Sequence, residues 1–434
     1  MQLFPAKIVR GEVFLPGDKS ISHRAAMICS MAEGESVIEN YSQSADCAST
    51  LNCLQELGVK ITHEAARVWI KGVGKNGFLP PKIPLDCGNS GTTMRLISGI
   101  LAGQRFESQL IGDESLSRRP MKRIIEPLKK MGARIESREG CPPLRLLGTN
   151  PLEPLEFKLS VASAQVKSCI LLAGLNASGE TAVIEPVPTR DHTERMLAHL
   201  GCGVQITESE GGRRISVSGK SRISPGNLRV PADISAAAFF LVAAACLPGS
   251  KLVIKNVGLN PTRSAILDVL VDLGVDLALT GRRDSSNEPV GDITICGGAI
   301  SDTVKETPVI RGKIISNLID ELPILAVFGT QLAGGLEVRD AQELRIKESD
   351  RISAVVSNLR RMNAEIDEFP DGFRVLRSRL TGADVDSMGD HRIAMALAVA
   401  ALLADGPTTI KNADCAAVSF PDFFDVLDSV VERP

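Results

Sequence analysis

Apolar and polar positions recur along the chain in one repeated order. A run of small apolar residues, typical of a buried helix, leads through a Gly-containing turn to a β-branched strand, and an amphipathic helix follows. The copies cover residues 23–61, 93–135, 164–204, 236–277, 322–366 and 391–434, and the sixth stops after its second helix. The pattern predicts an α/β protein built from six similar units.

The second helix of five units ends at a residue suited to a left-handed C-cap. Gly and Asn adopt this conformation at the lowest cost. The five positions are Gly58, Gly132, Gly201, Gly274 and Asn363. Their spacing of about 70 to 90 residues is too long for a solenoid repeat, so each unit is predicted to be a small subdomain of two helices and several strands.

The length of 434 residues favours two domains, each with three units. The chain is predicted to cross between them near Pro16-Gly17 and near Val230-Pro-Ala-Asp233, where an apolar strand precedes a new helix. We therefore expect residues 1–16 and 232–434 to form one discontinuous domain and residues 17–231 the other, with the active site in the cleft between them. The alternative is that both places are ordinary strand-to-helix turns.

Composition excludes several classes of protein. Aromatic residues make up 3% of the chain, which has one Trp and one Tyr, and the formal net charge is −3. This leaves neither a basic field nor stacking platforms for nucleic acid. The ten Cys and five His show no zinc-ligand spacing, so free thiols and no metal are expected. No signal peptide or membrane span is found, since the longest apolar run, residues 236–247, is too short. We expect a cytoplasmic protein.

Cations stand where several helices are predicted to begin. Lys19, Ser20 and Arg24 open the first helix, and free N–H groups at a helix start bind anions. Before the helix of the second unit, Gly91 lies in a Gly-rich turn that would let backbone amides approach a ligand, and Thr92 could cap that helix. Each segment alone is equally consistent with a solvated, capped helix start.

Further polar and charged residues lie where apolar packing would be expected. Gln165 and Lys167 open an otherwise apolar helix, and Arg119, Arg190 and Arg392 occupy comparable places. For the segment 117–123, which holds Arg119, a solvated basic helix start is the simpler interpretation. Several charged helix starts facing one cleft would nevertheless form an anion site.

Two groupings could perform proton chemistry. Asp320 precedes a strongly apolar helix, where partial burial could raise its pKa toward the range of a general base. Lys347 and Arg351 are four residues apart and are predicted to share one helical face, with Glu348 beside them. The alternative is an ion-pair ladder within one helix.

These motifs, in this order, resemble those of the 5-enolpyruvylshikimate-3-phosphate synthase family over essentially the whole chain. The matching strings are Pro16-Gly-Asp-Lys-Ser-Ile-Ser-His-Arg24, Gly88-Asn-Ser-Gly-Thr-Thr-Met-Arg95, Arg119-Pro120, Ser163-Ala-Gln165, Lys347-Glu-Ser-Asp-Arg351 and Asp390-His-Arg392. The resemblance implies the two-domain enolpyruvyl transferase fold, an inside-out α/β barrel with three βαβαββ units in each domain. It also implies transfer of the enolpyruvyl group of phosphoenolpyruvate to the 5-hydroxyl of shikimate 3-phosphate, with release of phosphate and without cofactor or metal.

The resemblance also implies a role for each matching residue. The residues expected to bind shikimate 3-phosphate are Lys19, Ser20, Arg24, Ser163, Ala164, Gln165, Arg190, Asp320 and Lys347. Those expected to bind phosphoenolpyruvate are Lys19, Gly91, Arg119, Gln165, Arg351 and Arg392. Asp320 is the implied base and Glu348 the implied proton donor to C3, while Lys347 and Lys19 complete the catalytic set. A monomer is expected.

Some positions depart from the family pattern. Val418 stands where many members carry a Lys, Glu343 where many carry Asn, and Ala164 where many carry a second Ser. These departures are similar to those of the class II subgroup, which is associated with tolerance to the inhibitor glyphosate. Gly91, however, is the residue of sensitive members, so we expect measurable inhibition.

Two other functions compete with this interpretation. The sister enolpyruvyl transferase that acts on UDP-N-acetylglucosamine shares the fold, but it usually carries a reactive Cys or Asp in a mobile loop, and the loop with Arg119 has no Cys. An inactive binding protein on the same fold would not need Asp320, Lys347 and Glu348. Phosphate release that requires both shikimate 3-phosphate and phosphoenolpyruvate distinguishes the three.

Overall fold

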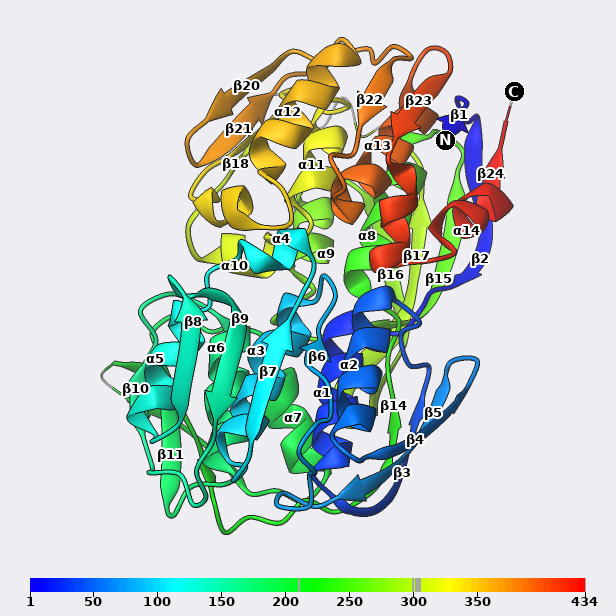
Figure 1. The fold of residues 1–434 in the computed structure, drawn as a ribbon. Helices are drawn as coiled ribbons and strands as arrows, with labels where there is room; N and C mark the ends of the chain where they lie inside the picture. The colour runs from blue at the N-terminus through cyan, green and yellow to red at the C-terminus, as the bar shows by residue number, and fades with distance from the viewer. Residues whose placement is uncertain (210, 299, 301–305, 434) are drawn as a thin grey trace. The chain divides into compact units, whose positions relative to one another are not determined.

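The chain forms two compact units. The structure is a computed structural model that describes residues 1–209, 211–298, 300 and 306–433 (Figure 1). Unit 1 comprises Met1–Pro16, Pro231–Arg283 and Pro289–Pro434, and unit 2 comprises Gly17–Val230 and Asp284–Glu288. The second crossing thus falls one residue before the expected boundary.

The short segment Asp284–Glu288 groups with unit 2, although it was expected in the other domain. It is the turn of a long hairpin. Within unit 2, His192 Nδ1 lies 2.7 Å from a carboxylate oxygen of Glu288, and the Asn287 amide donates to the Arg195 carbonyl at 2.9 Å. Hydrogen bonds to residues remote in sequence therefore hold this turn. The pattern of apolar residues does not predict such bonds.

Unit 2 contains three four-stranded sheets of the same kind. Their strand orders are β14-β3-β5-β4, β6-β7-β9-β8 and β10-β11-β13-β12. The strands are β3 (Glu33–Glu39), β4 (Lys60–Glu64), β5 (Arg67–Val73), β6 (Leu85–Asp86), β7 (Glu107–Ile111), β8 (Arg134–Arg138), β9 (Cys141–Leu147), β10 (Glu156–Lys158), β11 (Glu180–Glu185), β12 (Val204–Ser209), β13 (Gly212–Ser218) and β14 (Asn227–Arg229). The helices are α1 (Lys19–Ser30), α2 (Ala45–Glu56), α3 (Gly91–Ala102), α4 (Glu114–Ser117), α5 (Lys122–Lys130), α6 (Ala164–Gly174) and α7 (His192–His199).

Unit 1 also has three sheets, with orders β16-β17-β15-β2-β24, β18-β19-β21-β20 and β1-β23-β22. The strands are β1 (Gln2–Leu3), β2 (Ile8–Phe14), β15 (Lys251–Gly258), β16 (Asp276–Ser285), β17 (Glu288–Cys296), β18 (Val309–Ile310), β19 (Leu336–Val338), β20 (Ile366–Phe369), β21 (Gly372–Val375), β22 (Asp384–Asp386), β23 (Thr408–Lys411) and β24 (Val431–Glu432). The helices are α8 (Ile234–Cys246), α9 (Ala265–Asp272), α10 (Ile315–Leu318), α11 (Leu322–Gly329), α12 (Arg351–Arg361), α13 (His391–Leu403) and α14 (Phe423–Val430), with 3₁₀ helices η2 (Gly312–Ile314), η3 (Gln342–Ile346) and η4 (Ala413–Val418).

One βαβαββ unit explains these sheets, as predicted. In the second of the six repeats, which lies in unit 2, β6 pairs in parallel with β7 across α3, and the antiparallel hairpin β8–β9 follows α5. The same order recurs in the sheets that begin with β10 and β18. The predicted C-caps are confirmed, because all five residues have positive φ, from 67° at Asn363 to 100° at Gly132.

Two strands are exchanged where the chain crosses between the units. Elsewhere the edge strand before a central helix pairs with the strand after that helix, but β2 pairs with β15 in unit 1 and β14 pairs with β3 in unit 2. The sixth repeat lacks its closing hairpin, and the N-terminal β1 pairs antiparallel with β23 instead. The ends of the chain thereby complete sheets that the repeat leaves unfinished.

Apolar helices fill the centre of each unit. In unit 1, α8, α11 and α13 contact one another, and in unit 2, α3 contacts both α1 and α6. A Cβ atom at Gly99 of α3 would lie 2.3 Å from the Cys169 carbonyl oxygen of α6, so only Gly permits this approach. The helices lie inside and the sheets outside, which is the expected inside-out barrel.

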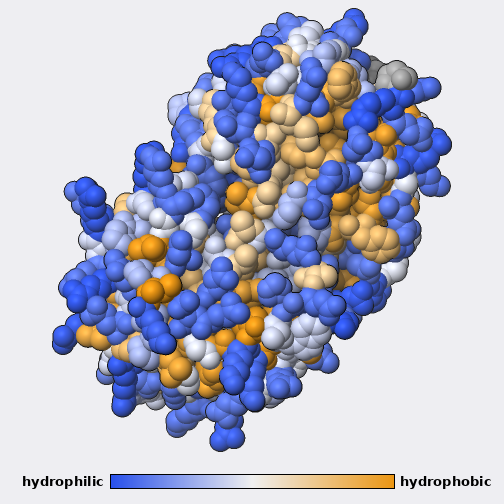
Figure 2. Space-filling view, turned by 45° about the vertical axis from the view of Figure 1, so that its right-hand side comes forward, coloured by the Kyte–Doolittle hydropathy of each residue, from blue (hydrophilic) through white to orange (hydrophobic). Residues whose placement is uncertain are grey.

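Polar residues cover most of the visible surface, with apolar residues in patches (Figure 2).

Candidate active site

The candidate site residues gather at the N-termini of these buried central helices. Five of the helices begin with a side chain that accepts a hydrogen bond from the first turn: Asp18 before α1, Ser90 before α3, Ser163 before α6, Asp233 before α8 and Asp390 before α13. An apolar run can start abruptly after such a cap, because the cap satisfies an otherwise free N–H group. The sequence therefore places polar chemistry directly at the end of a rigid apolar helix.

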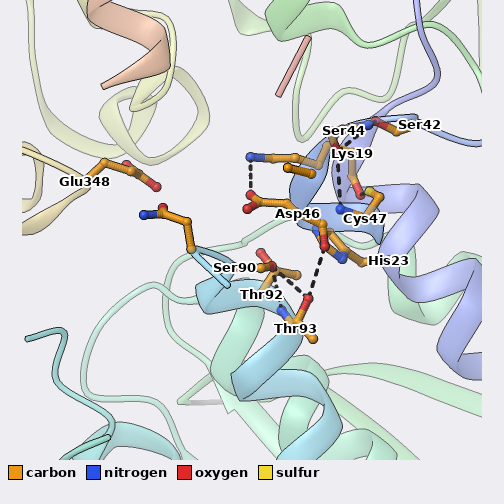
Figure 3. Close-up of polar contacts among 12 residues, drawn as sticks. Lys19, His23, Ser42, Ser44, Asp46, Cys47, Ser90, Thr92, Thr93 and Glu348 are labelled. Carbon is orange, nitrogen blue, oxygen red and sulfur yellow. Dashed lines mark hydrogen bonds and ion pairs between the residues drawn. The ribbon is translucent and has the colours of Figure 1, made fainter. Parts of the chain in front are cut away.

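Lys19 is fixed by a carboxylate. Its Nζ lies 2.8 Å from Asp46 Oδ2 of α2, and both side chains are largely buried, with 16% and 10% of their surface exposed (Figure 3). The Asp46 carbonyl accepts a hydrogen bond from Thr93 of α3 at 3.4 Å. The ammonium group is thus anchored from two other elements, so it has one position at the start of α1.

Arg24 is buried behind this ammonium group, one turn further along α1. Its guanidinium donates to the hydroxyls of Thr193 at 2.9 Å and Ser168 at 3.0 Å, and to the Ser20 carbonyl at 2.9 Å. These partners come from α7, α6 and α1, so Arg24 joins three elements. They are neutral, so they orient the guanidinium without cancelling its charge.

Gln165 connects α6 to α3. Its Oε1 accepts from Arg95 Nη1 at 2.7 Å, and its Nε2 donates to Thr92 Oγ1 at 2.8 Å. The prediction that Thr92 caps α3 is wrong, because Ser90 is the N-cap residue and Thr92 lies inside the first turn. The Thr92 hydroxyl instead fixes the amide of a candidate ligand residue.

Arg119 lies in the link between α4 and α5 and is 9% exposed. Its Nη2 donates to Asn89 Oδ1 at 2.8 Å and to Ser115 Oγ at 3.0 Å. Gly91 is close, because a Cβ atom there would lie 3.5 Å from Arg119 Nη1 and 2.7 Å from Arg95 Nη1. The solvated helix start considered for this segment is therefore wrong at Arg119, whose guanidinium is held against the Gly-rich turn.

The remaining unit 2 candidates surround the start of α6. Ser163 caps this helix and Ala164 is its first residue, while Arg190 is half-buried in the segment before α7. Behind them, the fully buried Lys167 Nζ lies 3.0 Å from Glu185 and 2.7 Å from Glu194. This buried ion pair ties α6 to β11 and α7, so it fixes the segment that carries Arg190.

In unit 1, three guanidinium groups surround Asp320. The nearest nitrogen–oxygen distances are 3.3 Å to Arg351, 3.5 Å to Arg392 and 4.0 Å to Arg263. The Asp320 side chain is 12% exposed. The sequence indicated only partial burial, and the structure adds three cations next to this carboxylate.

Arg351 is the centre of this cluster. It donates through Nε to Asp390 at 2.8 Å and through Nη2 to Glu348 at 2.6 Å, and it is 1% exposed. Burial alone would lower the pKa of Arg351, but the carboxylates of Asp390, Glu348 and Asp320 outweigh it and raise that pKa above its usual value. Arg351 is therefore permanently charged.

The predicted shared helical face of Lys347 and Arg351 is wrong. Lys347 follows the 3₁₀ helix η3, and α12 begins only at Arg351, with Asp350 as its N-cap. Lys347 and Glu348 thus lie in the link before the helix, and both are half-buried. The Glu348–Arg351 ion pair joins this link to the first residue of α12. The alternative of a series of ion pairs within one helix is therefore wrong.

Three residues of these clusters had no predicted role, namely Asp46, Arg95 and Arg263, and the carboxylate role of Asp390 was not predicted either. Arg263 is 3% exposed, and its Nη2 donates to Ser235 Oγ at 2.6 Å, which in turn donates to Glu321. The only signal in the sequence was the string Asn260-Pro-Thr-Arg263, whose charge precedes the apolar α9. The departing positions Val418 and Glu343 are half-buried in η4 and η3.

Neither cluster has the composition of a metal centre. Within the described ranges, no three His, Cys, Asp or Glu side chains are grouped as ligands for a metal ion. Over the same part of the chain, every helix is too short or too polar to cross a membrane.

Known proteins of one family are similar to this chain over nearly its whole length. The sequence model of the family described as EPSP synthase (3-phosphoshikimate 1-carboxyvinyltransferase) matches residues 4–427. A 3-phosphoshikimate 1-carboxyvinyltransferase of Solibacter usitatus is 49% identical over 433 residues, which is 99% of each chain. One of Koribacter versatilis is 50% identical over 431 residues, covering 99% of this chain and 98% of its own. The solved EPSP synthase of Acinetobacter baumannii superposes with a TM-score of 0.86 at 39% identity, covering 99% of this chain and 98% of that one.

The fold is that of the two-domain enolpyruvyl transferases. Within that class, the chain belongs to the EPSP synthase (3-phosphoshikimate 1-carboxyvinyltransferase) family. It is a transferase of the shikimate pathway.

Proposed function

We propose that the two clusters act on one pair of substrates, in the transfer of the enolpyruvyl group of phosphoenolpyruvate to the 5-hydroxyl of shikimate 3-phosphate. The observation that carries this proposal is the Asp320 cluster, where one carboxylate meets the guanidinium groups of Arg263, Arg351 and Arg392 within 4.0 Å. Such a site offers a proton acceptor beside charges that bind phosphate and carboxylate. Arginine suits these groups, because its planar fork binds them in two places at once.

Unit 2 holds most of shikimate 3-phosphate in this proposal. The residues in contact with it are Lys19, Ser20, Arg24, Ser163, Ala164, Gln165 and Arg190. The N-termini of α1 and α6 add backbone N–H groups and the positive ends of their dipoles. Asp320 and Lys347 contact the same substrate at the reacting hydroxyl.

Phosphoenolpyruvate is held by Arg119, Gly91, Lys19 and Gln165 of unit 2 and by Arg351 and Arg392 of unit 1. Asp320 removes the proton of the 5-hydroxyl as it attacks C2 of the enolpyruvyl group. Glu348 protonates C3, which gives a tetrahedral intermediate. Loss of a proton from C3 and of phosphate from C2 then restores the double bond.

Arg351 couples substrate binding to the protonation of Glu348. In the structure its Nη2 donates to Glu348 at 2.6 Å, which favours the ionised form of that carboxylate. An incoming phosphoenolpyruvate anion competes for the same guanidinium. Its binding therefore increases the proton affinity of Glu348 at the moment when a proton donor is required.

Measured phosphate release tests the proposal. Release should require both shikimate 3-phosphate and phosphoenolpyruvate, and it should stop when either is omitted. Release with UDP-N-acetylglucosamine and phosphoenolpyruvate, but none with shikimate 3-phosphate, would assign the chain to the sister transferase. We also expect a cytoplasmic monomer, and sedimentation of the full chain at about 46.3 kDa would support that state.

A further inference from the structure

A groove lies on the outer face of the first sheet of unit 2, formed by strands β14, β3, β5 and β4. Its volume is about 540 Å³, within the range of small-molecule sites. Val68 and Ile70 of β5 are buried, whereas Arg67, Trp69 and Lys71 alternate with them. The lining residues are Glu35, Val37, Lys60, Thr62, Trp69, Ile70 and Lys71.

Trp69 is the central side chain of this face and the only Trp of the protein. The strand register places Val37 opposite it on one neighbour and Thr62 opposite it on the other. Its indole is half-buried, with the Arg67 guanidinium 5.9 Å from the ring centre. Its two cross-strand neighbours are small side chains, so part of the indole stays accessible beside them.

Two lysines stand next to this indole. Lys60 and Lys71 are directly opposite each other on β4 and β5, a register in which like charges repel. Among the described residues, neither has a carboxylate oxygen within ion-pair distance, although Glu35 faces Lys71 in the register. In contrast, Arg67 on the same face is 2.7 Å from Glu39. The groove thus combines an aromatic surface with two cations whose repulsion an anion would relieve.

We propose that this groove is a second binding site, which takes a small aromatic carboxylate. The ring stacks on the indole of Trp69 and the carboxylate lies between the ammonium groups of Lys60 and Lys71. Glu35 makes the pair selective against ligands with a larger negative charge. The site belongs entirely to unit 2, and no residue assigned to the enolpyruvyl transfer lines it.

The single Trp allows a direct test. With ¹⁵N-labelled Trp, the full chain gives one indole N–H signal in a heteronuclear NMR spectrum. Titration with 2-naphthoate should shift this signal to saturation, because a stacked ring changes the local magnetic field. The double variant Lys60→Ala/Lys71→Ala should raise the Kd by about fivefold or more, and Lys82→Ala, an exposed lysine outside the groove, should leave it unchanged.

Two further compounds separate the contributions of ring and charge. The neutral 2-naphthylmethanol and the non-aromatic cyclohexanecarboxylate should both bind more weakly than 2-naphthoate, by about fivefold or more. An equal Kd for 2-naphthoate in the double variant, or equal binding of the neutral alcohol, would overturn the proposal. It would also be overturned if the signal moved with protein concentration alone and sedimentation showed a dimer, because a second copy would then cover the groove. Circular dichroism confirms that each variant is folded.

Discussion

The arginines of the two clusters are held by different kinds of partner, although Lys19 of unit 2 is itself paired with the Asp46 carboxylate. In unit 2, Arg24 and Arg119 bond to hydroxyl, amide and carbonyl groups. In unit 1, Arg351 bonds to the carboxylates of Asp390, Glu348 and Asp320. Neutral partners orient a guanidinium and leave its charge available for a substrate anion. Carboxylate partners form a set of groups among which charge and protons can be redistributed.

This difference separates two tasks within one repeated architecture. The unit 2 cluster is suited to holding a phosphorylated substrate in one position, whereas the unit 1 cluster is suited to proton transfer. Substitutions in unit 1 should therefore act mainly on kcat, and substitutions in unit 2 mainly on KM or on stability.

The largest effect is expected at Asp320. Asp320→Asn keeps the shape of the side chain but removes the proton acceptor, so kcat should fall by about 10²- to 10⁴-fold. The KM for phosphoenolpyruvate should stay equal or decrease, because the three guanidinium groups lose a competing anion. Steady-state phosphate release measures both, and the exposed Asp425→Asn is the matched control. An increase confined to KM would show that Asp320 only binds substrate.

The next largest effect is expected at Lys167, behind the unit 2 cluster. Lys167→Met leaves Glu185 and Glu194 buried without their cation, which should reduce the free energy of unfolding by about 3 to 5 kcal/mol. Urea unfolding measures the change, and adding Glu194→Gln should recover part of it. The exposed pair Arg118–Glu114 supplies the control, since Arg118→Ala should hardly change stability. A similarly small loss for Lys167→Met would mean that water or neighbouring charges compensate the two carboxylates.

A smaller effect, on substrate binding, is expected at Gln165. Gln165→Ala removes the hydrogen bonds to Arg95 and Thr92, so the guanidinium of Arg95 loses its partner at 2.7 Å. We expect KM to rise by about 10- to 100-fold, with kcat within about threefold, since a hydrogen bond to a charged group contributes about 1.5 to 3 kcal/mol. Loss of kcat comparable to that of Asp320→Asn would remove the distinction between the two clusters.

The smallest effect is a pH dependence of stability in unit 2. His23 is buried, and burial, with the nearby charges of Lys19 and Arg24, holds its pKa well below the usual 6.5. The unfolded chain therefore binds this proton first as the pH falls. The stabilising contribution of neutral His23 is complete above about pH 6.5 and is lost below it, by up to about 1.4 kcal/mol per pH unit.

Urea unfolding at about pH 7.5 and pH 5.5 tests this sign. The wild-type protein should lose about 1 kcal/mol more than His23→Gln over this interval. The exposed His63→Gln should behave like the wild type. Equal losses for the wild type and His23→Gln would show that His23 is protonated in the folded state.

Much of the fold could be predicted from the sequence, because local patterns of apolar and polar residues define the repeat. Local neighbours in the chain determine the apolar helices and their N-caps. They also determine the five C-cap residues, which are Gly58, Gly132, Gly201, Gly274 and Asn363. The exchange of β2 and β14 could not be predicted, because both strands carry the same pattern and only long-range pairing distinguishes their partners. The closing of the sixth unit by β1 is hidden for the same reason, since only two residues form that strand.

The family motifs name most of the candidate site residues, but they gave no role to Arg95 and Asp390, and Asp46 and Arg263 lie outside the quoted strings. Asp46 lies in the first turn of an ordinary amphipathic helix, where an acidic residue is common, and Arg263 precedes α9, so neither stands out locally. Thr92 and Lys347 were assigned to the wrong local structure, because a helix start depends on which side chain caps it. The direction of the electrostatic effect on Asp320 also depends on three arginines that are remote in sequence.

Proton transfer to C3 in D₂O tests the central claim most directly. With both substrates saturating, mass spectrometry follows the incorporation of deuterium at C3 of the enolpyruvyl group during a single turnover. Gln165→Ala should incorporate deuterium at a rate within about threefold of the wild type, whereas Glu348→Gln should be slower by about hundredfold or more. Incorporation by Glu348→Gln at the wild-type rate, or an equal loss in Gln165→Ala, would contradict the division of tasks between the two clusters.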